Sequence, residues 1–341
     1  MLLPTTVVGS HAWPGWYCQA QEAVEAGLYG PADMNELRRD AVSVAVQDQE
    51  RAGIDLITDG EMGRLDFNLG FYNAFTGLRP IPIERRLGVA AHDQRSRYEI
   101  VGPLDAPNGL GIVEEFLYLK SIARARIKST VPGPFTLSGR LSGRDRLSIA
   151  AELVPIVRRE LERLIEAGCT HIQLDEPSIA CYPSGIERYV ELFNATVRGL
   201  RATFSTHLCF GNYKARAVAN RSYRPLFPKI LDIAAEELIL EFAGREMAEA
   251  DLWQEFAAAK RLTAGVVDVK SSYLEPPEEV ARRVRVLLKY VPAELLGLCP
   301  DCGFSQTARH IAVVKLRNLV AGVRMVRAEL AGSAGGAAVT G

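Results

Sequence analysis

Short hydrophobic runs alternate along this chain with longer segments in which apolar residues recur every three or four positions. The short runs predict eight β-strands: Thr5–Gly9, Ile54–Thr58, Ile127–Val131, Thr170–Leu174, Phe204–Leu208, Glu237–Leu240, Leu262–Val267 and Leu295–Leu298. Within these runs apolar and polar residues do not alternate strictly, which is typical of parallel strands that are covered on both faces.

The longer segments predict helices between the strands. Their expected ranges are Met34–Ala52, Leu147–Ala167, Gly185–Leu200, Ala250–Lys260, Pro277–Tyr290 and Gln306–Leu330. Gly53 and Gly168 follow two of these patterns, at the position where a helix end favours a left-handed residue. Pro277 followed by Glu278 and Glu279 has the composition of a helix start.

Eight strands that alternate with helices predict an α/β fold, specifically a (β/α)8 TIM barrel, with a doubly wound open sheet as the alternative. We expect one catalytic barrel over residues 1–331 and a disordered, low-complexity tail over 332–341. The chain between the second and third strands is too long for one β-to-α unit, so we expect an insertion over about 62–126, a small hairpin plus a helix, at the barrel mouth.

Composition and charge narrow the function classes. The chain has 341 residues, of which 48% are hydrophobic, and a formal net charge of −1. This balance favours neither nucleic acid nor an anionic membrane surface as a partner. We find neither a signal-peptide pattern near the first residue nor an apolar run of about 18 residues, so we expect a cytoplasmic protein with no membrane partner. Six cysteines in a reducing compartment favour metal binding, catalysis or packing over disulfides.

Polar residues follow seven of the eight predicted strands. They are Ser10, Asp59 with Glu61, Asp175 with Glu176, His207 with Cys209, Glu241, Asp268 with Lys270, and Asp301 with Cys302. The carboxyl ends of barrel strands meet at one face, where the active site of this fold lies. We therefore expect these side chains to converge.

Four of these residues form a credible tetrahedral zinc site: His207, Cys209, Glu241 and Cys302. His207 and Cys209 are two positions apart, so they lie on the same side of an extended strand. The alternative interpretation has Cys209 as a buried apolar filler and His207 as a hydrogen-bonded core residue. The pair Cys299 and Cys302 could alternatively be redox-active, but it lacks the helix start of a redox dithiol, and we interpret Cys299 as strand core.

The acids Glu61 and Asp175 are candidates for holding a substrate ammonium group or for proton transfer. The alternative for Asp175 is a structural role, either as a helix cap or in an ion pair with an arginine.

At these residues the chain resembles the catalytic, carboxyl-terminal barrel of cobalamin-independent methionine synthase. The matching stretches are TTVVGS at 5–10, DGE at 59–61, GPFT at 133–136, LDEP at 174–177, HLC at 207–209, Glu241, VVDVKS at 266–271 and PDCG at 300–303. They span residues 1–330, and the family's separate amino-terminal barrel has no counterpart. The resemblance therefore implies a short, single-barrel member.

The resemblance implies that Zn²⁺ is held by His207, Cys209, Glu241 and Cys302, and that the zinc-bound thiolate of homocysteine attacks a methyl group to give methionine. It further implies that Glu61 and Asp175 hold the amino group and that Ser10 belongs to the carboxylate-binding segment. Asp268 matches the family's aspartate after the seventh strand, and the resemblance implies a catalytic role for it in the proton relay to the leaving group.

Two departures from the family's pattern concern the methyl donor and the proton relay to the leaving group, respectively. Arg140 stands where the family has a folate-stacking tryptophan, and Lys270 stands where it has a histidine. We therefore interpret Arg140 as substrate-binding and Lys270 as catalytic. We expect a donor other than polyglutamyl folate, for example a methylated corrinoid or a methyl-donor protein.

Other functions stay open at this point. The chain also resembles epoxyalkane:coenzyme M transferase, in which a zinc-bound thiolate opens an epoxide; Arg140, Lys270 or Arg64 could then bind a sulfonate. A zinc hydrolase or a porphyrinogen-decarboxylase-like enzyme is a more distant alternative, because two thiolates disfavour hydrolysis. A non-enzymatic zinc store or scaffold is the remaining one.

Overall fold

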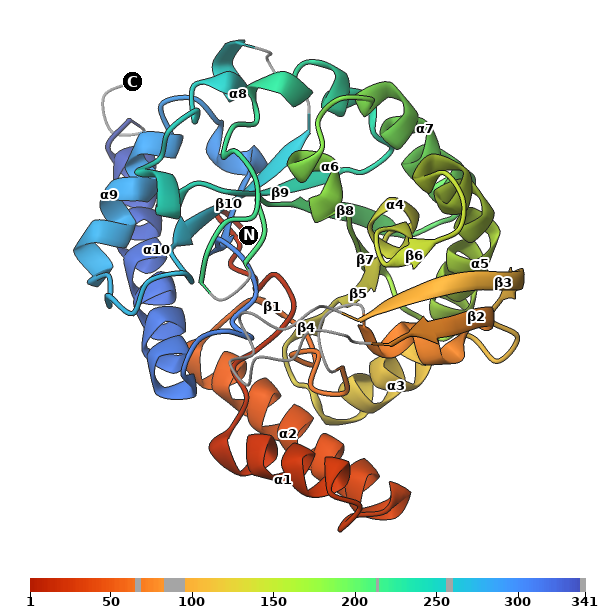
Figure 1. The fold of residues 1–341 in the computed structure, drawn as a ribbon. Coiled ribbons are helices and arrows are strands. Elements are labelled where there is room, and N and C mark those ends of the chain that lie inside the picture. Colours follow the sequence, from red (N-terminus) through yellow and green to blue (C-terminus); the bar gives the residue numbers. More distant parts are fainter. Residues whose placement is uncertain (65–68, 83–95, 213–214, 256–259, 338–341) are drawn as a thin grey trace.

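Parallel strands form a ring at the centre of the molecule in the computed structural model (Figure 1), which describes residues 1–64, 69–82, 96–212, 215–255 and 260–337. Six strands pair in parallel in sequence order: β5 (Ser129–Pro132), β7 (His171–Asp175), β8 (Thr203–Leu208), β9 (Glu237–Glu241), β10 (Arg261–Val267) and β11 (Leu296–Pro300). Each lies within a residue or two of its predicted range.

The first strands close this sheet into a barrel. β1 (Leu56–Ile57) pairs in parallel with β4 (Arg126–Ile127), which leads directly into β5. On the other side, Thr6 bridges Leu56 and Thr5 bridges Leu298 of β11, both in parallel. The ring therefore has eight parallel positions in the described part of the chain, which confirms the predicted barrel over the open sheet.

The first predicted strand, Thr5–Gly9, is reduced to these two bridges. A cause lies in the side chain of Asp55, which accepts hydrogen bonds from the backbone N–H and the hydroxyl of Thr5, both at 2.8 Å. This carboxylate takes up a backbone donor that an extended ladder would use.

Helices surround the barrel as an outer ring. They are α1 (Gly15–Glu25), α2 (Pro31–Ala52), α3 (Ile112–Ile122), α5 (Arg146–Glu166), α7 (Ile186–Val197), α8 (Leu252–Glu255), α9 (Pro277–Leu287) and α10 (Arg309–Ala337). Sequence analysis missed α1, and the predicted helix at 250–260 is described only as α8, because 256–259 lie outside the described residues. Gly53 and Gly168 adopt φ of +85° and +90°, as their positions after helices predicted.

The helices pack through the predicted apolar stripes. In α5, Leu153, Ile156, Leu161 and Leu164 are buried. Each large apolar side chain of this kind contributes about 1.5–3 kcal/mol when it is fully removed from water. Among the described residues, no helix is both long enough and apolar enough to cross a bilayer.

The insertion contains an antiparallel hairpin of β2 (Thr76–Ile81) and β3 (Arg97–Asp105), and β3 also pairs with β6 (Leu141–Ser142). Residues 65–68 and 83–95 of the expected insertion lie outside the described residues. The helix α3 packs against α2 and α5, so it belongs to the outer ring and the inserted part ends before it.

The carboxyl-terminal helix α10 runs to Ala337, beyond Gly332, where we expected a disordered tail to begin. Residues 338–341 lie outside the described residues.

Candidate active site

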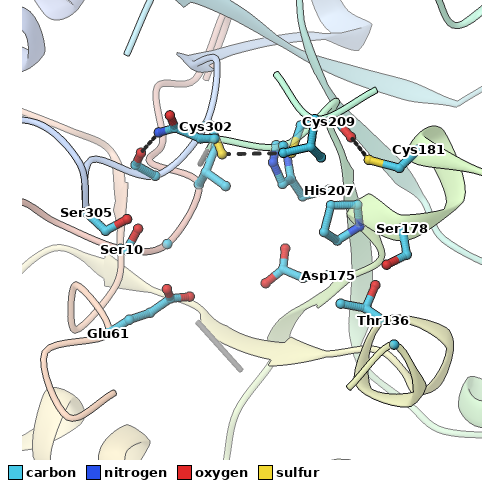
Figure 2. Close-up of a pocket in the computed structure, with 18 of the residues that line it drawn as sticks. Ser10, Glu61, Thr136, Asp175, Ser178, Cys181, His207, Cys209, Cys302 and Ser305 are labelled. Atoms are coloured by element: carbon cyan, nitrogen blue, oxygen red, sulfur yellow. Dashed lines mark hydrogen bonds between the residues drawn. The ribbon is translucent and has the colours of Figure 1, made fainter. Parts of the chain in front are cut away.

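A cavity of about 490 Å³ opens at the carboxyl ends of the barrel strands. Eight of the predicted residues were expected to reach this face as metal or substrate-binding groups, and seven line the cavity: Ser10, Glu61, Arg140, Asp175, His207, Cys209 and Cys302. Figure 2 shows the two sulfurs and the imidazole on one side of the cavity, facing the carboxylates of Asp175 and Glu61. The barrel thus brings together residues that are far apart in sequence.

Three predicted metal ligands form one cluster. The ligand atoms of His207, Cys209 and Cys302 all lie within 4.8 Å of one another. His207 comes from β8, Cys209 follows the same strand, and Cys302 follows β11. The Sγ atoms of the two cysteines are 3.8 Å apart, a separation that tetrahedral coordination of one ion can accommodate.

The unsatisfied polar atoms of this cluster fit a metal site. His207 is 3% exposed, and neither of its ring nitrogens has a hydrogen-bond partner among the described residues. Burying a polar group without a partner costs free energy, so such an atom calls for a ligand. Imidazole and thiolate are the ligands that Zn²⁺ prefers.

Glu241, the fourth predicted ligand, lies outside the three-residue cluster. Its Oε2 forms an ion pair of 2.9 Å with Nζ of Lys270, while its Oε1 is buried and has no hydrogen-bond partner in the part of the chain that the structure describes. Burial alone would lower the pKa of Lys270, but the charges of Glu241 and the two clustered cysteines raise it above its usual value. Lys270 is therefore charged and bound to this carboxylate.

The two acids opposite the cluster are buried. Glu61 accepts hydrogen bonds from the Thr130 hydroxyl at 2.8 Å and from Nη1 of Arg64 at 3.2 Å. Burial raises the pKa of Glu61 to about 7, although Arg64 opposes the shift, and burial raises the pKa of Asp175 to about 6. Two carboxylates in one buried cavity favour a cationic ligand such as an ammonium group.

The backbone at Glu61 adopts an unusual conformation, and the Glu61 side chain lies very close to Gly9. Glu61 has φ of +54°, a left-handed conformation that costs a non-glycine residue on the order of 1–3 kcal/mol. Its carboxylate reaches Gly9 so closely that a Cβ there would lie 2.4 Å from Oε1. Only glycine therefore fits at position 9 while Glu61 keeps this orientation.

Arg140 lines the cavity, and its Nη1 donates to the backbone carbonyl of Ser96 at 3.2 Å. A second arginine that sequence analysis missed, Arg146, lines the same wall, with its guanidinium 4.0 Å from the centre of the Phe135 ring and 5.0 Å from that of Tyr182. Arg146 begins α5 directly after the N-cap Asp145, so its position in the sequence indicated a helix surface.

Asp268 is not among the described residues that line the cavity. Its Oδ1 accepts a hydrogen bond from the backbone N–H of Lys270 at 2.8 Å, and its own N–H donates to Glu275. The direct catalytic role that we expected for Asp268 stays a prediction. In this structure its visible contribution is to hold the segment that carries Lys270.

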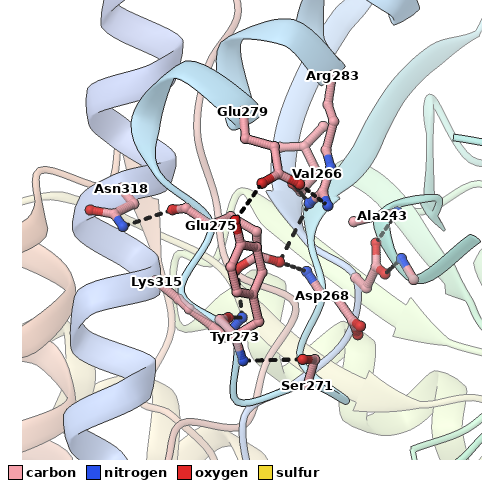
Figure 3. Close-up of polar contacts among 12 residues, drawn as sticks. Ala243, Val266, Asp268, Ser271, Tyr273, Glu275, Glu279, Arg283, Lys315 and Asn318 are labelled. Atoms are coloured by element: carbon pink, nitrogen blue, oxygen red, sulfur yellow. Dashed lines mark hydrogen bonds and ion pairs between the residues drawn. The ribbon is translucent and has the colours of Figure 1, made fainter. Parts of the chain in front are cut away.

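Glu275 anchors that segment to the barrel wall (Figure 3). It is 1% exposed and pairs with Lys315 of α10 at 2.6 Å and with Arg283 of α9 at 3.4 Å. Because both helices and the loop after β10 meet at this one carboxylate, the position of Lys270 depends on residues far from the cavity.

Fold and site together define a barrel protein in which two cysteines and a histidine that could hold a metal ion lie at the carboxyl ends of the strands. Residues 3–324 match the family model described as the catalytic domain of cobalamin-independent synthase. The chain belongs to this family, as its sequence motifs indicated.

Individual relatives span nearly the whole chain. It is 33% identical to a methionine synthase of Thermococcus kodakarensis, over 97% of this chain and 95% of that protein. It is 31% identical to one of Sulfurisphaera tokodaii, over 96% of this chain and 94% of that protein. A solved B12-independent methionine synthase from Shewanella sp. W3-18-1, in complex with selenomethionine, superposes with a TM-score of 0.83 at 26% identity, covering 97% of this chain and all of that one.

Proposed function

We propose that the protein is a zinc-dependent thiol alkyltransferase that methylates the thiol of homocysteine to give methionine. The observation that carries this proposal is the arrangement of one cavity: a cluster of two cysteines and a histidine faces two buried acids. Its relatives that are named methionine synthase support the same activity.

In the proposed site, His207, Cys209 and Cys302 hold Zn²⁺, and Glu241 supplies a fourth, exchangeable ligand. Bound zinc would act as a Lewis acid that keeps the substrate thiol deprotonated at neutral pH. Protein side chains and backbone bind the rest of the substrate: Asp175 and Glu61 bind the ammonium group of homocysteine, and the segment around Ser10 binds its carboxylate. This places the substrate sulfur toward the cysteine cluster.

Arg140 and Arg146 both line the cavity, and we propose that the methyl donor binds beside them. Because Arg140 replaces the family's stacking tryptophan, we propose a donor other than polyglutamyl folate. A methylated corrinoid, free or carried by a donor protein, fits this proposal.

The coenzyme M alternative requires a cation for the sulfonate, and the candidates Arg64 and Lys270 already pair with carboxylates of the protein. Arg64 is 5% exposed and binds Glu61, Glu115 and Thr130. Lys270 binds Glu241. The buried carboxylates of Glu61 and Asp175 would repel a sulfonate and attract an ammonium group, so the cavity favours an amino-acid thiol. The cysteine pair also disfavours a hydrolase, which prefers nitrogen and oxygen ligands with a bound water.

Zinc K-edge X-ray absorption of the purified protein, without and with homocysteine, tests the proposal. We expect two sulfur ligands in the free protein and three with homocysteine. A shell that stays at two sulfurs with homocysteine but gains one with coenzyme M would favour the alternative substrate. Protein without bound zinc after incubation with the metal would contradict the zinc site itself.

A further inference from the structure

A buried lysine lies inside the barrel beneath the cavity, and the proposed chemistry gives it no role. Lys128 follows β4 and is 1% exposed. Its Nζ donates a hydrogen bond of 2.6 Å to Oε1 of Gln173, a residue of β7 that is fully buried. Removing a charged group from water in this way is costly, so the contact calls for an explanation.

Lys128 fixes the orientation of the Gln173 amide. A lysine ammonium is a donor only, so it requires the oxygen end of the amide, and the NH₂ end must then point the other way. That end donates two hydrogen bonds of 2.7 Å, one to Oδ1 of Asp175 and one to the backbone carbonyl of Val8. Both amide hydrogens are used.

These two acceptors belong to opposite halves of the proposed amino-acid site. Asp175 is the acid proposed to bind the substrate ammonium, and Val8 begins the Val8–Ser10 segment proposed to bind the carboxylate; both line the cavity. We propose that Gln173, oriented by Lys128, is a positioning residue that sets the spacing between the ammonium and carboxylate subsites and so selects an α-amino-acid thiol. This inference rests on the function proposed above.

The chemistry of the amide supports the same role. An NH₂ group can donate to a carboxylate, but it cannot accept a hydrogen bond from a protonated acid. The Gln173 contact therefore matches a carboxylate at position 175, which is the partner that an ammonium ligand needs.

Substrate discrimination provides the test. The dissociation constants of homocysteine and of 2-mercaptoethanol, a thiol with neither ammonium nor carboxylate, are measured by calorimetry on the zinc-loaded protein. In Gln173→Glu, the new side chain can still pair with Lys128 but cannot donate to Val8 or Asp175. We expect its homocysteine affinity to fall at least about tenfold, the scale of one charge-assisted hydrogen bond, and its 2-mercaptoethanol affinity to change little.

A second variant covers the case in which Gln173→Glu fails to fold. Lys128→Met combined with Gln173→Leu removes the buried lysine together with its amide partner, so Asp175 loses its hydrogen bond from residue 173, and we expect the same selective loss. Thr263→Val is the matched control, because Thr263 is a buried barrel residue whose hydroxyl contacts Glu237 instead. We expect its affinities for both thiols to match the wild type.

An equal change in both thiol affinities, or none, in the Gln173 variants would overturn this inference and leave the proposed function intact. Failure of the wild type to prefer homocysteine over 2-mercaptoethanol would overturn the proposed substrate and the inference together.

Discussion

The Sγ atoms of Cys209 and Cys302 lie 3.8 Å apart although 93 positions separate these residues in the sequence. They approach because β8 and β11 end at the same face of a closed barrel. Thiol side chains this close, with a histidine whose ring nitrogens lack partners, form the part of the site that a metal would complete.

Replacing one of these cysteines should release the metal. We expect Cys302→Ser to lose most bound zinc in elemental analysis, because a serine hydroxyl is a poor ligand for zinc in place of a thiolate. Cys299→Ser is the matched control: Cys299 belongs to the same CxxC but packs in the core against Val8 and Ile239. Full zinc retention by Cys302→Ser would contradict the ligand assignment.

Neutralising Asp175 should separate substrate binding from metal binding. We expect Asp175→Asn to weaken homocysteine binding about tenfold or more, the scale of a charge-assisted hydrogen bond, while zinc content stays at the wild-type level. Calorimetry with homocysteine and metal analysis of the same sample check this. Unchanged homocysteine affinity would show that the ammonium binds elsewhere.

The affinity for homocysteine should depend on pH. The pKa values of Asp175 and Glu61 are raised to about 6 and about 7, mainly by burial. Both acids gain a proton as the pH falls through these values and then no longer attract an ammonium group. We expect the affinity to rise between about pH 5 and pH 8, a window that reaches about one pH unit below the lower pKa and one above the higher.

This pH profile needs a control for loss of metal at low pH, so zinc content is measured at each point. Asp175→Asn should flatten the lower part of the rise. A wild-type profile that is flat from about pH 5 to pH 8 with zinc retained would contradict the role of the two acids.

The loop that carries Lys270 should depend on the ion pair between Glu275 and Lys315, whose side chains are 1% and 0% exposed. Lys315→Met leaves Glu275 with one cation fewer in the interior, which typically costs about 3–5 kcal/mol. Urea unfolding should show a destabilisation of this size.

Arg285→Ala is the comparison for this variant, because the ion pair of Arg285 with Glu329 lies on the surface. We expect no measurable change in its unfolding midpoint. Equal stability of the two variants would show that the buried pair contributes little.

Much of the fold can be predicted from local patterns of apolar and polar residues in the sequence. Each predicted strand from Thr170 onward matches an observed one closely, because continuous apolar runs between helical patterns are specific to parallel strands buried on both faces. The convergence of His207, Cys209 and Cys302 was also predictable, since polar groups at strand ends meet at one face once the barrel closes. The helix α1 was missed, and its N-cap Pro14 offers no side chain that would have marked a helix start.

The tertiary structure alone decided how these residues are partnered. The sequence places Glu241 at a strand end beside the other ligands, but only the folded chain shows it bound to Lys270 and outside the three-residue cluster. Likewise, the sequence shows Gln173 only as one polar residue within a predicted strand and does not show its partners. Its link from Lys128 to Asp175 and Val8 exists only because three strands meet inside the barrel. Hydrogen-bond partners and burial depend on distances between segments far apart in the chain, and local sequence patterns do not carry that information.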